Sequence, residues 1–257
     1  MSGRLEGRFV LVTGAGKGLG VAIAEGLARE GAHVAIHYRT SASGAEETAA
    51  RIRALGRKTV LVQGDIAEAE DVSRMAAEVI AAFGRIDVLV NNVGDMAASQ
   101  MSWRELTPES LDHTLKLDIK GTLLMTHEFG RRMLDDQQSG VIVNIGSRVV
   151  VEGSPRAPQY AAAKYAILGI SKSYAHALAP HVRVNTLGPG FVETETLRER
   201  KDWKTGRREA VLARTPLARI PTPEDIVPPV VFLASDDSRH ITGAFLLCDG
   251  GHSMVGA

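Results

Sequence analysis

Short apolar runs alternate with longer amphipathic segments along most of the sequence, and this alternation limits the choice of fold more than any other feature. The runs are apolar at consecutive positions, which is typical of strands that are covered on both faces. The predicted strands are residues 9–13, 33–38, 59–63, 86–91, 141–145, 182–187 and 244–248. The predicted helices are residues 18–30, 45–55, 69–83, 108–134, 159–179 and 223–234.

Regular strand–helix alternation predicts parallel strands, because each helix returns the chain to the same end of the sheet. Gly31 and Gly84 stand where helices are expected to end. We find no linker rich in Pro, Gly or Ser and no internal repeat. The sequence therefore predicts an α/β fold, with residues 1–257 forming a single-domain doubly wound parallel sheet (Rossmann-like) of about seven strands.

Charge and composition exclude several functions. The chain has 30 basic and 30 acidic residues, which argues against a protein whose main task is to hold nucleic acid or an anionic membrane. No apolar run approaches the roughly 18 residues of a membrane span, and the first residues do not resemble a signal peptide. Cys248 is the single cysteine, which fits a reducing compartment. We therefore expect a cytoplasmic protein.

A glycine-rich turn, Thr-Gly-Ala-Gly-Lys-Gly-Leu-Gly at positions 13–20, joins the first predicted strand to the first helix. Glycines allow positive φ and let backbone N–H groups approach a pyrophosphate at a helix N-terminus. The spacing differs from the commoner G-x-G-x-x-G, so a plain tight turn is the alternative. Its place between strand and helix favours a nucleotide site. The residues expected to contact the nucleotide are Gly14, Lys17, Gly18, Leu19 and Gly20.

The end of the second predicted strand distinguishes between cofactors. An acidic residue there would bind the ribose 2′-OH of NAD, but no Asp or Glu occurs between Gly31 and Ala45. Cations and hydroxyls suit a 2′-phosphate instead. We therefore expect NADP(H), with NAD(H) as the alternative cofactor; Lys17 and Arg39 would otherwise be solvated loop charges. The predicted ribose-phosphate residues are Lys17, Tyr38, Arg39, Thr40 and Ser41.

Polar residues follow the third and fourth predicted strands at the edge where open α/β sheets bind ligands. Asp65 and Ile66 follow the third strand, and Asp65 could either accept a hydrogen bond from adenine or cap the helix near Ala69. Asn92 and Gly94 follow the fourth strand and are expected beside the cofactor. Asn91 is expected to brace the sheet.

Tyr160 and Lys164 lie four residues apart at the start of a predicted helix, which places them on one face, one turn apart. A free tyrosine has a pKa near 10, and a neighbouring ammonium group favours the phenolate. By itself, Y-x-x-x-K is more often a surface helix pair. Ser147 changes this interpretation, because it ends a predicted strand on the edge that carries the glycine turn. Its hydroxyl could polarise a carbonyl, or it could satisfy strand-end backbone groups.

Together these motifs resemble the short-chain dehydrogenase/reductase family over nearly the full chain. The matching positions are T-G-x-x-x-G-x-G at 13–20, N-N-x-G at 91–94, Ser-x12-Tyr-x3-Lys at 147–164, Pro-Gly at 189–190 and the ending at 246–251. The 3-oxoacyl-acyl-carrier-protein reductases are similar members.

The resemblance implies a role for each matching residue. Tyr160 would be the general acid in reduction and the base in oxidation, Lys164 would assist it and hold the nicotinamide ribose, and Ser147 would orient the carbonyl. Pro189, Gly190, Val192 and Thr194 would lie at the nicotinamide. The family implies a homotetramer and needs no metal.

Two positions depart from the family pattern. Val93 replaces an alanine, and Asp118 replaces the asparagine that helps hold a water in the proton relay to the lysine. We expect Asp118 to keep this catalytic position and to hold Lys164 more firmly protonated, a charge effect that identical pH–rate profiles of wild type and Asp118→Asn would refute.

The substrate end of the sequence is less informative. Residues 191–214 interrupt the alternation and are predicted to form a lid. Its basic residues could dock an acidic carrier protein, although a solvated helix face is the simpler interpretation. Arg148 and Arg156 could face a substrate carboxylate or solvent, with solvent favoured for Arg156. The apolar wall candidates are Met96, Phe191 and Trp203.

The predicted activity is interconversion of a carbonyl and a secondary alcohol by hydride transfer. The substrate could be a 3-oxoacyl thioester or a small cyclic, sugar or steroid-like alcohol, and the sequence does not separate these. A nucleotide-binding regulator or scaffold with little turnover is the alternative from another class.

Overall fold

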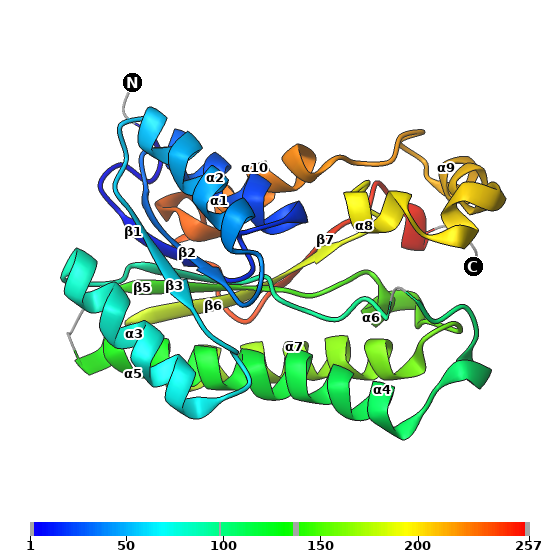
Figure 1. Cartoon of the computed structure of the whole chain (residues 1–257), viewed down its shortest axis with the longest axis horizontal. Coiled ribbons are helices and arrows are strands. Elements are labelled where there is room, and N and C mark those ends of the chain that lie inside the picture. The colour runs from blue at the N-terminus through cyan, green and yellow to red at the C-terminus, as the bar shows by residue number, and fades with distance from the viewer. Residues whose placement is uncertain (1–2, 98, 136–138, 255–257) are drawn as a thin grey trace.

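The computed structural model describes residues 3–97, 99–135 and 139–254, and a seven-stranded parallel sheet runs through its centre (Figure 1). The strand order is β3-β2-β1-β4-β5-β6-β7, and every neighbouring pair is parallel. The predicted α/β sheet of seven strands is therefore confirmed. The strands are β1 (Phe9–Val12), β2 (His33–Tyr38), β3 (Thr59–Gln63), β4 (Val88–Asn91), β5 (Gly140–Ile145), β6 (Val182–Pro189) and β7 (Phe245–Cys248).

Helices cover both faces of the sheet, which explains why the strands are apolar at consecutive positions (Figure 1). One face carries α1 (Gly18–Arg29), α2 (Ala42–Ala54) and α10 (Val227–Ala234). The other carries α3 (Ala69–Phe83), α4 (Pro108–Thr114), α5 (Thr122–Asp135) and α7 (Pro158–Ala177). Each face has its own buried apolar cluster. The chain reverses its order of strand addition between β1 and β4, so a crevice is expected at their carboxyl ends.

The single long helix predicted over residues 108–134 is wrong. The structure divides it into α4, a π-helical segment (Leu115–Gly121) and α5. Asp118 is fully buried in the π-helical segment. Interruptions of this kind occur frequently at functional sites. The segment spans only seven residues, too few for the hydrophobic period of the sequence to distinguish it from an α-helix.

Residues 191–214 fold into short helical pieces, namely α8 (Glu195–Arg198), a π-helical turn (Trp203–Arg207) and α9 (Arg208–Arg214). Their side chains form a small cluster apart from the two main ones, made by Leu197, Trp203 and Val211 with Phe191 and Ile220. A further short helix, α6 (Val149–Glu152), follows β5 and was not predicted. No helix within the described ranges is both long and apolar enough to cross a membrane.

Candidate active site

The glycine-rich turn between β1 and α1 needs its glycines for two reasons. Gly14 and Gly18 have φ of +67° and +58°, a region that side chains with a Cβ rarely adopt. At Gly20 the reason is space, because a Cβ would lie 2.3 Å from the carbonyl oxygen of Gly14. A Cβ at Gly18 would meet nothing within 4 Å, so the backbone there borders open space. Gly20 is therefore a packing residue behind the turn.

His37 holds this turn through a hydrogen bond, although the sequence assigned it no role. Its ring is buried, with Nδ1 3.0 Å from the backbone nitrogen of Gly14 and Nε2 3.0 Å from the carbonyl oxygen of Gly64. Nδ1 accepts the Gly14 N–H, so Nε2 must carry the proton that is donated to Gly64. The neutral ring thus ties the ends of β1, β2 and β3 together. Burial lowers the pKa of His37 below its ordinary value of 6.5.

We expect His37→Asn to cost about 1 kcal/mol at pH 8, since it removes the bond to Gly64 while an amide oxygen can still accept from Gly14. The wild-type stability should fall as the pH drops below about 6.5, because the unfolded His37 then binds a proton that the folded ring rejects, with a limiting slope of about 1.4 kcal/mol per pH unit. The stability of His37→Asn should lack this pH dependence. Urea unfolding of both proteins at pH 8 and pH 5.5 measures the change in the free energy of unfolding. An equal change in wild type and variant would contradict the buried neutral ring.

At the end of β2, two predicted cofactor residues contact each other. Arg39 Nη1 lies 3.3 Å from Asp65 Oδ2, and the Arg39 side chain is 52% exposed. Asp65 Oδ1 accepts from the backbone nitrogen of Ala67 at 2.9 Å, so Asp65 fixes the turn after β3. The alternative that Asp65 caps α3 is wrong, because Glu68 occupies that position.

The start of α2 is packed directly on the glycine turn. A Cβ at Gly16 would lie 2.4 Å from Ser41 Oγ, and one at Gly44 would lie 2.1 Å from the carbonyl oxygen of Gly16. Ser41 is thus next to the turn that carries Lys17. Thr40 is exposed, whereas Tyr38 packs against the apolar cluster under α1.

Two residues at the ends of β3 and β4 have structural roles. The Ile66 side chain is buried in the cluster beneath α3 and α5 and would contact a Cβ placed on Gly121. The predicted cofactor contact of Ile66 is therefore wrong as far as its side chain is concerned. Asn91 is buried and donates to Thr126 Oγ1 at 3.1 Å and to Asn144 Oδ1 at 2.8 Å, as expected of a residue that braces the sheet.

A cavity of about 390 Å³ opens beside the glycine turn; we call it the glycine-walled cavity. It brings together most of the predicted cofactor and catalytic residues. Those lining it are Gly14, Lys17, Gly18, Leu19, Asn92, Gly94, Ser147, Tyr160, Lys164, Pro189, Gly190, Val192 and Thr194. The side chains of residues 38–41 and Asp65 do not line it.

Lys164 and Asp118 form a buried ion pair behind this cavity. Lys164 Nζ lies 3.0 Å from Asp118 Oδ2, and their side chains are 5% and 0% exposed. Burial alone would lower the pKa of Lys164, but the charges of Asp118 and Tyr160 outweigh it, so that the pKa is raised. Burial raises the pKa of Asp118. A Cβ on Gly94 would lie 2.7 Å from Lys164 Nζ, so glycine is needed there for the pair to form.

The Asp118 carboxylate also holds the loop after β4. Its Oδ1 accepts from the backbone nitrogen of Asp95 at 2.5 Å, and Asp95 in turn accepts from Thr114 Oγ1 at 2.7 Å. Sequence reasoning did not select Asp95. The only available signal was a carboxylate three residues after the Asn-Asn pair.

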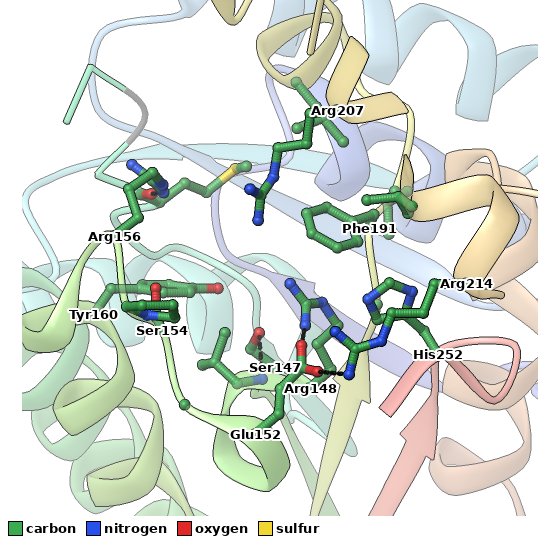
Figure 2. Close-up of a pocket in the computed structure, with 18 of the residues that line it drawn as sticks. Ser147, Arg148, Glu152, Ser154, Arg156, Tyr160, Phe191, Arg207, Arg214 and His252 are labelled. Carbon is green, nitrogen blue, oxygen red and sulfur yellow. Dashed lines mark hydrogen bonds and ion pairs between the residues drawn. The ribbon is translucent and has the colours of Figure 1, made fainter. Parts of the chain in front are cut away.

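A second cavity, of about 430 Å³, lies beyond Tyr160 and Ser147 (Figure 2). Five arginines line it, and we call it the arginine-walled cavity. The residues that line both cavities are Met96, Ser147, Tyr160, Gly190 and Val192. Tyr160 and Ser147 therefore stand at the boundary between a glycine-rich pocket and a cationic one. In the described part of the chain, no group of three His, Cys, Asp or Glu side chains could hold a metal.

The solvent-facing interpretation of Arg156 is wrong. Its guanidinium donates to the carbonyl oxygens of Met96, Ala97 and Gln100, and its side chain lines the arginine-walled cavity. Arg148 is also buried, next to Ser147. Of the predicted apolar walls, Met96 and Phe191 line the cavity.

The basic segment is also more than a solvated helix face. Arg200, Arg207 and Arg214 point inward and line the cavity. Arg198, Lys204 and Arg208 pair on the outside with Glu193 and Glu199. Trp203 lies behind the cavity wall, where it stacks on Phe191 with ring centroids 5.5 Å apart.

Comparison with known proteins agrees with this geometry. Residues 14–253 match a family model described as enoyl-(acyl carrier protein) reductase. An L-rhamnose 1-dehydrogenase (NAD(P)(+)) of Sphingomonas sp. is 36% identical over 248 residues, 96% of each chain. A 3-oxoacyl-[acyl-carrier-protein] reductase of Staphylococcus aureus is 36% identical over 96% of this chain and 98% of its own.

Solved structures show the same fold. A short-chain dehydrogenase from Burkholderia cenocepacia, crystallised in complex with NADP, has a TM-score of 0.88 and 32% sequence identity. The match covers 97% of this chain and 99% of that one. Full-length similarity at these identities, together with the same fold, identifies the family. The chain belongs to the short-chain dehydrogenase/reductase family and is an NAD(P)-dependent oxidoreductase that acts on alcohol or carbonyl groups.

Proposed function

We propose that the protein is an NADP(H)-dependent oxidoreductase that interconverts a carbonyl and a secondary alcohol, with Tyr160 as the group that transfers the proton. One observation carries this proposal: Tyr160 and Ser147 line both the glycine-walled and the arginine-walled cavity. A substrate in one cavity and a cofactor in the other would meet at these two side chains.

When bound, the nicotinamide cofactor supplies or accepts the hydride at the substrate carbon. In the reducing direction Ser147 donates a hydrogen bond to the substrate carbonyl oxygen, and Tyr160 donates the proton that this oxygen needs to become a hydroxyl. In oxidation Tyr160 takes that proton back. Lys164, paired with Asp118, keeps a positive charge 5.6 Å from the centre of the Tyr160 ring, where it stabilises the negative charge that develops as the proton leaves for the substrate oxygen.

The residues around the glycine-walled cavity suit a dinucleotide. The backbone at Gly18 borders open space at the start of α1, where a pyrophosphate could bind. The nicotinamide end would lie against the residues from Pro189 to Thr194. The ribose phosphate would lie near Lys17 and Ser41, with Arg39 turning from Asp65 to reach it.

The double variant Lys17→Met/Arg39→Met should lower kcat/KM with NADPH about tenfold or more and leave kcat/KM with NADH nearly unchanged, because charge-assisted phosphate contacts are lost. Initial rates followed at the nicotinamide absorbance with both cofactors measure this ratio. Arg53→Met is the matched control, since Arg53 lies exposed on α2 and pairs with Glu46. A wild-type preference for NADH would refute the proposed phosphate site.

The substrate range needs a panel of carbonyls and alcohols with both cofactors. Relatives act on a sugar and on 3-oxoacyl thioesters, so both classes belong in the panel together with cyclic alcohols. Turnover of any of them supports the proposal. Binding of cofactor with no turnover of any compound would favour a regulator or scaffold instead.

We further propose that residues 191–214 form a lid over the arginine-walled cavity. Their own apolar cluster and the kink at Gly206, with φ +106°, support a segment that can move as a unit. A homotetramer is the proposed assembly, and the exposed Leu123 on α5 is a candidate for its contacts. Light scattering of the purified protein tests the assembly.

A further inference from the structure

The arginine-walled cavity carries more positive charge than its own carboxylates can balance. Arg148, Arg156, Arg200 and Arg207 line it together with Arg214 (Figure 2). Glu152 pairs with Arg148 and Arg214, while Asp202 pairs with Arg200 and Arg207. Even without Arg214, four guanidinium groups thus face two carboxylates.

Arg148 and Arg207 each share their carboxylate partner with another arginine. Arg148 Nη1 pairs with Glu152, which also pairs with Arg214. Arg207 donates no side-chain hydrogen bond within the described ranges, and its Nε is 3.6 Å from Asp202 Oδ2. Asp202 is already engaged by two nitrogens of Arg200, at 2.5 and 3.0 Å.

Arg148 and Arg207 both lie against the same aromatic ring. Their guanidinium carbons lie 3.9 Å and 5.6 Å from the centre of the Phe191 ring. Figure 2 shows Arg207 reaching into the cavity from the lid, while Arg148 extends from the opposite wall beside Ser147. Burial and the charge of Arg207 lower the pKa of Arg148 to about 10, a sign that these positive charges are not fully compensated.

Like charges held together in a cavity are costly unless an anion occupies it. A carboxylate or a phosphate would accept hydrogen bonds from both guanidinium groups in the geometry that arginine prefers. The cavity volume of about 430 Å³ is in the range of small-molecule sites. Because Tyr160 and Ser147 line the same cavity, such an anion would lie within one small molecule's length of the proton donor.

We propose that the substrate carries an oxyanion group, a carboxylate or a phosphate, which Arg148 and Arg207 bind while its carbonyl or hydroxyl carbon faces Tyr160 and Ser147. This proposal rests on the proposed oxidoreductase function and narrows its substrate class to small anionic ketones and hydroxy compounds. An acidic carrier protein is a poorer fit, because the Arg148 side chain is only 10% exposed and the outer cations of the lid already pair with Glu193 and Glu199.

Matched pairs of carbonyl compounds test the charge directly. The carboxylate arm compares 3-oxobutanoate with 3-oxobutanamide and 4-oxopentanoate with 4-oxopentanamide, and the phosphate arm compares dihydroxyacetone phosphate with dihydroxyacetone. We expect kcat/KM to favour the anion at least about tenfold in one arm, the usual effect of a charged hydrogen bond. Arg148→Met and Arg207→Met should each lower that ratio about tenfold. Arg198→Met, an exposed arginine of the same lid, should leave it unchanged.

A ratio near one in every pair, or a ratio that both cavity variants leave unchanged, would overturn the proposal while the oxidoreductase activity itself stands. Activity restricted to a carrier-bound thioester would also overturn it.

A binding measurement separates failure of the anion site from failure of the enzymatic function. The chain has two tryptophans, so Trp103→Phe leaves Trp203, which stacks on Phe191, as the reporter. Phosphate and malonate, titrated at constant ionic strength, should change its fluorescence saturably, and adding Arg207→Met should weaken the binding about tenfold. No saturable change with either anion would refute the site, whether or not any carbonyl is reduced.

Discussion

Tyr160→Phe is expected to lower kcat about a thousandfold with any carbonyl that the wild type reduces. The substitution removes only the hydroxyl, and general acid catalysis typically contributes about 10²- to 10⁴-fold. The ring itself remains between the two cavities and near Lys164. Cofactor affinity and the midpoint of urea unfolding should therefore change little. Single-turnover rates with saturating NADPH measure the chemical step separately from binding.

Tyr165→Phe provides the matched control, because it deletes the same hydroxyl from the same helix at a side chain that is 50% exposed. Its kcat should equal that of the wild type. If Tyr160→Phe retained more than about a tenth of wild-type turnover, the proton would have to come from another group. If neither protein nor variant turned over any carbonyl while both bound cofactor equally, the scaffold hypothesis would gain support.

The sequence was sufficient to predict the sheet, because each strand of a parallel sheet is covered on both faces and appears in the sequence as a continuous apolar run. Strands such as β2 and β3 begin and end at the predicted residues. The prediction of one long helix over residues 108–134 was wrong, because its interruption has no corresponding signal in the sequence. The π-helical segment is only seven residues long and buries Asp118 and Gly121, so it adds no apolar periodicity from which the sequence could locate it.

Some residues of the candidate site could be predicted from the sequence and others could not. The residues that line the glycine-walled cavity were predictable, since the motifs carry their own spacing and stand at strand ends. His37 was not, because a buried neutral histidine that holds backbone groups looks in sequence like any polar residue near a strand end. The Arg39–Asp65 ion pair was not predicted, because the two residues follow different strands and each was assigned to the cofactor.

The arginines that line the arginine-walled cavity could not be assigned to it from the sequence. Charge alternation along residues 198–214 predicts a solvated face, and the outer pairs with Glu193 and Glu199 agree with that. Only the fold reveals that the kink at Gly206 precedes an arginine turned inward, and that Arg148 at the start of α6 approaches the same ring of Phe191. Contacts between distant segments leave no periodic signal, so the cationic cavity could not be predicted.

The second large effect is expected from Lys164→Met, which should destabilise the protein by about 3–5 kcal/mol at pH 8. Asp118 has no exposed surface, and removing its partner leaves a buried carboxylate without a counter-charge. Urea unfolding at pH 8 and pH 5 measures the loss. It should be smaller at pH 5, because burial raises the pKa of Asp118 in the folded protein. A folded state that binds the proton more readily than the unfolded chain gains stability as the pH falls.

The double variant Lys164→Met/Asp118→Asn separates the structural effect from the catalytic one. Asparagine keeps an oxygen that can accept from the backbone of Asp95 but carries no charge, so most of the lost stability should return, with no gain on acidification. Turnover should stay low in both variants, because the positive charge near Tyr160 is absent from each. A Lys164→Met protein as stable as the wild type would show that the pair is not needed for folding. A double variant with full activity would show that Lys164 has no part in the reaction. If Lys164→Met does not fold at pH 8, the double variant still tests the catalytic role, since its buried site holds no unpaired charge.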